Sequence, residues 1–194
     1  MQWKNVLATF LICLPVGAIA QVAPSAKVRE LPIGIGVGFS RYDLDYGPSR
    51  YMEGLVVRAG VGLWRGVGVD VSARTIFMNT PPELTRMQQN TFLGGVYYEG
   101  PQMYHFRPFV RGAGGVGTIE FPSKNPQYTR DTYTVYAPSA GVEIPITRQV
   151  YARGEYEYQF WKDFQSTKYL NPQGFTIGVT YYPHGLRSRR HPEL

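Results

Sequence analysis

The chain has 194 residues, of which 18% are charged, and its formal net charge is +6 at pH 7. Its hydrophobic content of 43% and its 15 tyrosines exclude an intrinsically disordered chain, and its low charge excludes a long coiled coil. No apolar run reaches the roughly 18 residues that a membrane-spanning helix needs. The 22 glycines and 15 prolines follow no collagen period. The composition therefore indicates a β-rich chain with many turns.

Residues 1–20 have the pattern of a secretory signal peptide. A short start with Lys4 precedes an apolar stretch over residues 6–16, and Ala18-Ile19-Ala20 supplies small residues at the expected cleavage site. The single cysteine, Cys13, lies in that apolar stretch. We therefore expect an exported mature chain that begins near Gln21 and has no disulfide framework.

From residue 31 onward, apolar residues alternate with small or polar ones at the period of two that is typical of β-strands. In residues 33–40 every odd position is apolar and every even position is Gly or Ser. In chain order, the alternation predicts eight strands, over residues 33–40, 55–63, 67–74, 92–99, 108–118, 132–146, 150–161 and 175–182. No stretch of helical periodicity separates them. The pattern predicts an all-β fold, an eight-stranded antiparallel up-and-down barrel.

The connections between the predicted strands alternate in length. Those near residues 43–50, 78–90, 120–131 and 163–173 are long and polar, whereas those at 64–66, 100–107 and 147–149 are short. We accordingly expect a signal peptide (1–20), a short N-terminal segment (21–30), a single barrel domain (31–183) and a basic tail (184–194).

The distribution of charge over the two strand faces distinguishes two β architectures. A soluble barrel buries its apolar face, whereas an outer-membrane barrel turns that face to lipid and encloses polar groups. The less apolar face carries a nearly balanced set of mid-strand charges: Arg58, Asp70, Arg74, Arg111, Glu143, Arg153, Glu155 and Glu157. An unpaired charge inside a protein is strongly destabilising, so a balanced set is typical of an enclosed space. We predict that these eight side chains form an ion-pair network in the lumen, where glycines on the first two strands leave room for them.

Aromatic residues on the apolar face gather near the two ends of the predicted strands. Toward the long connections they are Phe39, Tyr51, Phe77, Phe92, Tyr136, Tyr158 and Phe160, and toward the short ones they are Trp64, Tyr98, Phe109 and Tyr181. Two such belts are typical of the aromatic girdles at the two interfaces of a membrane.

Residues 106–117 (FRPFVRGAGGVG) and 147–161 (TRQVYARGEYEYQFW) resemble the eight-stranded outer-membrane barrels of Gram-negative bacteria, the family of the outer-membrane protein A transmembrane domain in the porin superfamily. The resemblance implies short periplasmic turns, longer surface loops and both termini in the periplasm. It also implies insertion by the outer-membrane assembly machinery, which reads an aromatic residue at the end of the last strand. Tyr181 fits that signal, but Pro183 and the tail over 184–194 follow it.

Two patterns that could indicate catalysis or ligand binding fit a barrel better. Residues 112–117 match G-x-G-x-x-G, but no helix follows them to hold a phosphate. His105 lies in a short connection, and His184 and His191 lie in the tail, away from the surface end where a lipid-cleaving site would be needed. We therefore predict no catalytic, cofactor-binding or metal-ligating residue, no cofactor, and a protein that is not an enzyme.

Arginines supply the net positive charge at one end of the predicted barrel. They lie in the short turns and in the tail: Arg65, Arg107, Arg148, Arg187, Arg189 and Arg190. Such a rim suits anionic lipid headgroups rather than nucleic acid. We expect a monomer in the cell outer membrane whose partners are outer-membrane lipid and the assembly machinery.

The interior of an eight-stranded barrel is only just wide enough for its own side chains. The sequence therefore predicts a packed, salt-bridged lumen and a structural or surface-interaction role. Two alternatives stay open. One is a small porin-like channel gated by Arg58, Arg111, Glu143, Arg153 and Glu155, and the other is a soluble, secreted lipocalin-like binder.

Overall fold

The structure, a computed structural model, describes residues 31–43, 51–78, 87–120, 130–164 and 168–183. The expected signal peptide, N-terminal segment and basic tail lie outside the described residues. Ten strands are described: β1 (Ile33–Asp43), β2 (Tyr51–Trp64), β3 (Val67–Met78), β4 (Gln88–Glu99), β5 (Arg107–Glu120), β6 (Arg130–Pro145), β7 (Val150–Tyr158), β8 (Phe160–Phe164), β9 (Lys168–Leu170) and β10 (Gln173–Tyr181).

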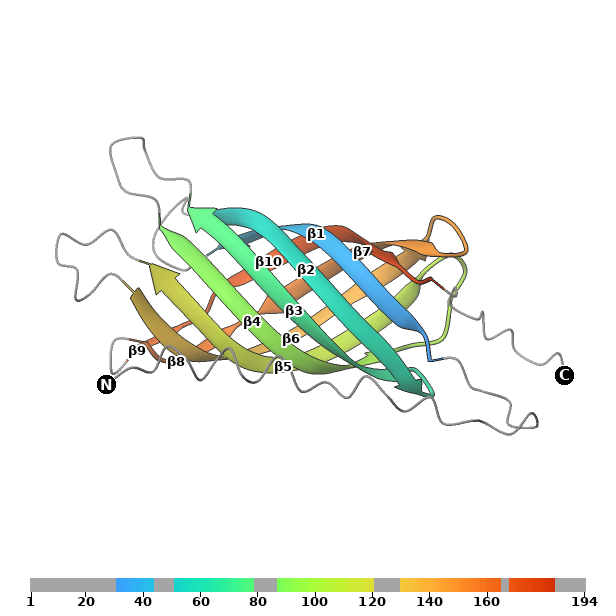
Figure 1. Ribbon diagram of the computed structural model, residues 1–194, viewed down its shortest axis with the longest axis horizontal. Helices are drawn as coiled ribbons and strands as arrows, with labels where there is room; N and C mark the ends of the chain where they lie inside the picture. The colour runs from blue at the N-terminus through green and yellow to red at the C-terminus, as the bar shows by residue number, and fades with distance from the viewer. Residues whose placement is uncertain (1–30, 44–50, 79–86, 121–129, 165–167, 184–194) are drawn as a thin grey trace, which may run out of the picture.

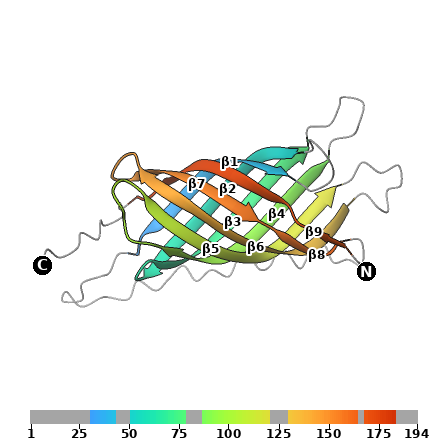
Figure 2. The ribbon, with the colours of Figure 1, turned by 180° about the vertical axis from the view of Figure 1, so that it is seen from behind.

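These strands form one closed antiparallel barrel with eight positions around its wall (Figures 1 and 2). Each position is called here a stave, and it holds one strand or two consecutive ones. β7 and β8 follow one another along the same stave, because β6 pairs with both. β9 and β10 share the next stave, because β9 pairs with β8 and β10 pairs with β7. β1 pairs with β10, and β5 pairs with β6, so no edge stays open between the first and last staves. The predicted eight-stranded up-and-down barrel is confirmed.

A proline accounts for the break between β7 and β8. The β6 ladder to this stave stops at Ser139–Glu157 and resumes in the same register at Tyr136–Phe160. Pro138 lies in the gap, and a proline has no N–H to give to a ladder. On its other side the strand stays paired, because the backbone N–H of Gln159 donates to the carbonyl of Pro172 at 2.7 Å in the register of β7 with β10.

The turn from β2 to β3 is the tight hairpin that the sequence predicts. Arg65 and Gly66 form its two central residues, with φ of 46° and 88°. Positive φ at both positions is the geometry that matches the twist of a two-residue hairpin. Arg65 is one of two non-glycine residues of the described chain in this strained region.

Both ends of the described chain lie at the end of the barrel that carries the three short connections, called here the short-turn end; the other is the long-connection end. The carbonyl of Pro32 accepts from Gly62, and the N–H of Tyr182 donates to the carbonyl of Gln149, so both ends are tied to short turns. No helix in the described part of the chain is long and apolar enough to cross a membrane.

The apolar face of the strands points outward over most of the barrel. Val37, Val57 and Ile177 are 54 to 73% exposed, whereas their neighbours along the strands are buried or half-buried. Glu143 and Glu155, in contrast, are at most 3% exposed. The predicted orientation, with aliphatic side chains outside and charges inside, is confirmed.

The strands extend beyond their predicted ends at the long-connection end. β3 continues to Met78, β4 begins at Gln88, and β9 lies within the long connection expected over 163–173. In these extensions the pattern is inverted, since Thr75 and Asn90 point outward and Ile76 is buried. A search for apolar-outward alternation therefore stops too early, because polar residues share the outer wall here with Phe77.

Candidate functional site

The eight charged residues singled out in the sequence come together in the lumen as one continuous series, called here the ion-pair chain. Its order is Arg74, Glu157, Arg111, Asp70, Arg58, Glu155, Arg153 and Glu143, with the sign of the charge alternating at every step. Four cations face four anions, so the chain is formally neutral. It runs from the middle of the lumen to the short-turn end.

The half of the ion-pair chain nearer the long-connection end is built on β3, β5 and β7. Arg74 Nη1 lies 2.7 Å from Glu157 Oε1, and Arg111 Nη1 lies 3.3 Å from Glu157 Oε2. Arg111 Nε donates to both oxygens of Asp70, each at 2.9 Å. Glu157 and the Arg111 side chain are completely buried. Because each carboxylate accepts from charged donors, the cost of removing these ions from water is offset by strong hydrogen bonds.

The other half connects β2, β6 and β7. Arg58 Nη2 lies 2.5 Å from Glu155 Oε2, and the same oxygen lies 3.2 Å from Arg153 Nε. Arg153 Nη1 lies 2.8 Å from Glu143 Oε1. Glu155 therefore holds two guanidinium groups together that would otherwise repel one another.

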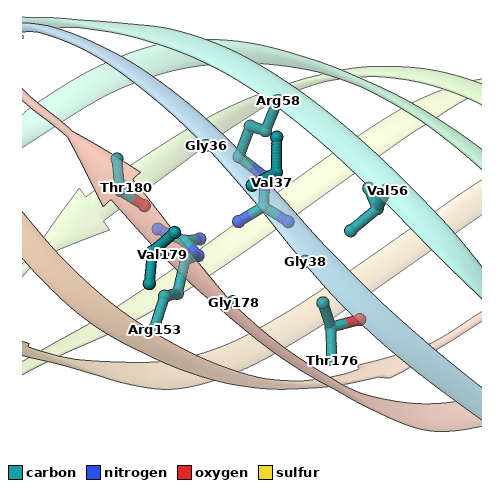
Figure 3. A pocket seen from close by; sticks show the side chains of 10 residues that line it. All are labelled: Gly36, Val37, Gly38, Val56, Arg58, Arg153, Thr176, Gly178, Val179 and Thr180. Atoms are coloured by element: carbon teal, nitrogen blue, oxygen red, sulfur yellow. The ribbon is translucent and has the colours of Figure 1, made fainter.

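Glycines line the wall beside this arrangement, on β1 and β10 rather than on the first two strands as predicted. Figure 3 shows Arg58 and Arg153 reaching toward one another past the bare backbone of β1 and β10. Gly36, Gly38 and Gly178 lie on these two strands and line a cavity of about 20 Å³ with the two arginines. A cavity of this size has room for about one water molecule, so the lumen is tightly packed at this point.

Neutral side chains donate further hydrogen bonds to the carboxylates. Glu157 accepts from Tyr42 at 3.0 Å and from Gln159 at 2.7 Å. Ser139 donates to Glu155 at 2.6 Å, and Tyr182 donates to Glu143 at 3.2 Å. The sequence analysis did not identify these donors. The signal was their spacing, because Ser139, Tyr182 and Gln159 lie at the inward parity of their strands.

Apolar side chains fill the lumen at the long-connection end. The buried cluster consists of Tyr42, Met52, Ile76, Met78, Met87, Leu93, Ala113, Ile119, Val135, Ala137, Trp161 and Leu170. This cluster is called here the apolar plug. Gln159 connects it to the ion-pair chain, because its Oε1 accepts from Trp161 Nε1 at 2.8 Å while its Nε2 donates to Glu157. The sequence analysis, which expected a polar lumen throughout, missed the plug.

Two expectations at the short-turn end are wrong. Phe109 was expected on the outer surface, but it is buried, and its ring lies 3.6 Å beneath the guanidinium of Arg153. It is two residues from Arg111 in β5, so the two must share the inward face. Arg107 was expected in the exposed basic rim, but it lies at the start of β5 and pairs with Glu99 at 3.3 Å inside the wall. Of the three turn arginines, Arg65 and Arg148 are exposed.

Within the described residues, no group of three His, Cys, Asp or Glu side chains is placed to hold a metal ion. The carboxylates of the ion-pair chain are close to one another, but each is already paired with arginine. The arrangement is suited to fixing strands relative to each other and to filling the lumen with neutralised charge.

The fold has solved relatives at low sequence identity. Neisserial surface protein A (NspA) aligns with a TM-score of 0.58 at 12% identity, over 78% of this chain and 96% of that chain. Ail, the attachment invasion locus protein of Yersinia pestis, solved in complex with the heparin analogue sucrose octasulfate, aligns with 0.55 at 16% identity, over 78% and 98%. OprG, an outer membrane protein of Pseudomonas aeruginosa, aligns with 0.50 at 12% identity, over 78% and 95%.

Among the curated protein sequences, none matches this chain. The sequence profile of the family described as "Outer membrane protein beta-barrel domain" matches residues 7–182, which is most of the chain. The match agrees with the closed barrel, its outward aliphatic face and its enclosed charges. The chain belongs to the outer membrane protein β-barrel family and is a protein of the cell outer membrane.

Proposed function

We propose that this protein is a closed, non-conducting barrel whose role is structural or lies in contacts at the cell surface. The observation that carries the proposal is that two different sets of side chains fill the lumen, one after the other along the barrel. The apolar plug occupies the long-connection end, and the ion-pair chain occupies the rest. An ion that entered from either side would have to cross a packed, mainly apolar layer and displace paired charges.

The plug supports closure more strongly than the ion-pair chain does. Its largest members, Tyr42, Met52, Ile76 and Trp161, are at most 1% exposed. Apolar interiors pack at crystal-like density, and the buried Gln89 and Gln159 beside these residues bond to one another at 3.3 Å. Ion pairs alone can rearrange to let an ion through, whereas an apolar layer offers the ion no replacement for its water.

Planar-bilayer recording tests the proposal. We expect the folded protein to give no steady single-channel steps in bilayers where a porin of known conductance does. The variants Trp161→Ala and Arg111→Ala address the plug and the ion-pair chain separately. Steady steps from the unaltered protein, with an ion selectivity that changes in Arg111→Ala, would overturn the proposal and establish the small gated channel instead.

The absence of catalysis is part of the same proposal. A general acid or base needs a group that is free to exchange a proton with substrate at an accessible site. The buried carboxylates Glu143, Glu155 and Glu157 each face an arginine within 3.3 Å and lie inside the wall. They are therefore better suited to holding the barrel together than to acid–base chemistry.

Outer-membrane barrels place short turns in the periplasm and longer connections outside the cell. On that basis the long-connection end of this barrel is the surface end. Any partner at the cell surface then meets the connections over 44–50, 79–86, 121–129 and 165–167, which lie outside the described residues. We also propose a monomer that the assembly machinery inserts, and the mass of the detergent-solubilised protein tests its oligomeric state.

A further inference from the structure

A groove of about 340 Å³ lies on β3, β4 and β5 toward the short-turn end. Its outward-facing lining residues are Val67, Val96, Tyr98, Val110 and Gly112. The three strands lie side by side in the wall (Figure 1). Because the aliphatic face of an outer-membrane barrel contacts lipid, this groove opens into the hydrocarbon of the membrane.

Glycines, which have no side chain, form the floor of the groove. A side chain at Gly112 would meet no atom within 4 Å, so the space above it is empty. Gly112 lies in register between Val96 on β4 and Pro138 on β6. Next to it, Gly94 and Gly114 face one another across β4 and β5. The backbone is therefore bare here, and the exposed Val96 and Val110 rise as walls.

Tyr98 closes the groove on the side of the short turn. Its ring leans toward the hairpin, since its Cε2 atom would lie 3.4 Å from a Cβ atom at Gly66. The same hairpin carries Arg65, which is exposed and whose guanidinium lies 4.6 Å over the ring of Trp64. Arg65 is two residues from Val67, and no acidic side chain is among the residues that line the groove. The short-turn end of this apolar groove thus lies near a hairpin that carries an exposed cation and an aromatic residue.

We propose that this groove binds one acyl chain of an anionic glycerophospholipid from the periplasmic leaflet, with the lipid phosphate paired to Arg65. An apolar channel with a cation at its interfacial end complements a lipid that has a chain and a phosphate. The groove spans only neighbouring strands of one wall, so its shape fits a chain better than a second barrel. The inference concerns the outer surface and holds whether or not the lumen conducts.

Native mass spectrometry of the detergent-solubilised protein, titrated with phosphatidylglycerol, tests the proposal. We expect a species with one retained phosphatidylglycerol. Gly112→Leu fills the groove and should weaken this binding about tenfold, because the acyl chain loses its buried contact. Arg65→Ala should weaken it about fivefold, and should not affect binding of a diacylglycerol with the same chains.

Gly154→Leu is the matched control. Gly154 faces outward on β7, between Val142 and Ile177, and a side chain there would also meet no atom within 4 Å. This variant should bind phosphatidylglycerol like the unaltered protein, and a shift in gel migration on heating would show that all variants are folded. Equal binding by Gly112→Leu and Gly154→Leu would overturn the proposal. A dimer mass that disappears in Gly112→Leu would also overturn it, in favour of a second copy.

Discussion

The two halves of the lumen are built from the same strands, but apolar side chains fill one half and charged side chains fill the other. At the long-connection end, Met52, Ile76 and Trp161 pack as in a soluble protein, whereas near the short turns Arg58, Glu155 and Arg153 neutralise one another. The same staves pass through both halves, and every second residue points inward in each. The difference is in what surrounds the barrel at each level.

The outer surface changes together with the lumen. Beside the ion-pair chain the outward residues are aliphatic, such as Val57 and Val69, but beside the plug they include Arg41, Glu53 and Thr134. A wall in lipid must be apolar outside and can enclose charge, whereas a wall in water can bury apolar residues inside. The staves therefore extend past the membrane, and beyond it the barrel buries apolar side chains inside, as a soluble barrel does.

The largest expected effect is at the junction of the two halves. Glu157→Ala leaves Arg74 and Arg111 buried without this partner, so we expect a loss of about 3–5 kcal/mol in the free energy of unfolding. Urea unfolding in phospholipid vesicles, followed by tryptophan fluorescence, measures it. Adding Arg74→Met should restore part of the loss, because one unpaired cation is removed. No recovery in the double variant would contradict the electrostatic account.

In the apolar plug, the loss of stability on substitution should come from the cavity left behind rather than from an unpaired charge. Ile76 is 1% exposed, and we expect Ile76→Ala to lower the free energy of unfolding by roughly 3 kcal/mol. The same urea experiment measures this cost, which does not depend on ionic strength because no charge is removed. A strong salt dependence of the Ile76→Ala effect would contradict a cost set by a cavity alone.

The smallest effect is expected at an ion pair that lies outside the lumen and is exposed to solvent. Arg41 and Glu53 lie 3.4 Å apart on the outer surface, with side chains 60% and 38% exposed. Exposed pairs contribute little because water and salt screen them, so Glu53→Gln should change stability by less than about 1 kcal/mol. A loss as large as that of Glu157→Ala would mean that this surface is covered rather than open to water.

Much of the site could be read from the residues in order. Arg153, Glu155 and Glu157 alternate with outward residues in one strand, so period two alone puts all three on the same face. The same rule would have placed Phe109 inside with Arg111. Pair identities could not be read in this way, because Arg74 on β3 and Glu157 on β7 are separated by three strands and meet only across the closed lumen.

The sequence by itself determined the number of staves, the face that meets lipid and the members of the ion-pair chain, because alternation and charge are local properties of each strand. Tertiary structure alone decided the partners of each charge, the apolar plug at the long-connection end and the bare groove around Gly112. These depend on the register and closure of the barrel, which bring residues from non-neighbouring strands together and fix the level at which the outside changes from lipid to water.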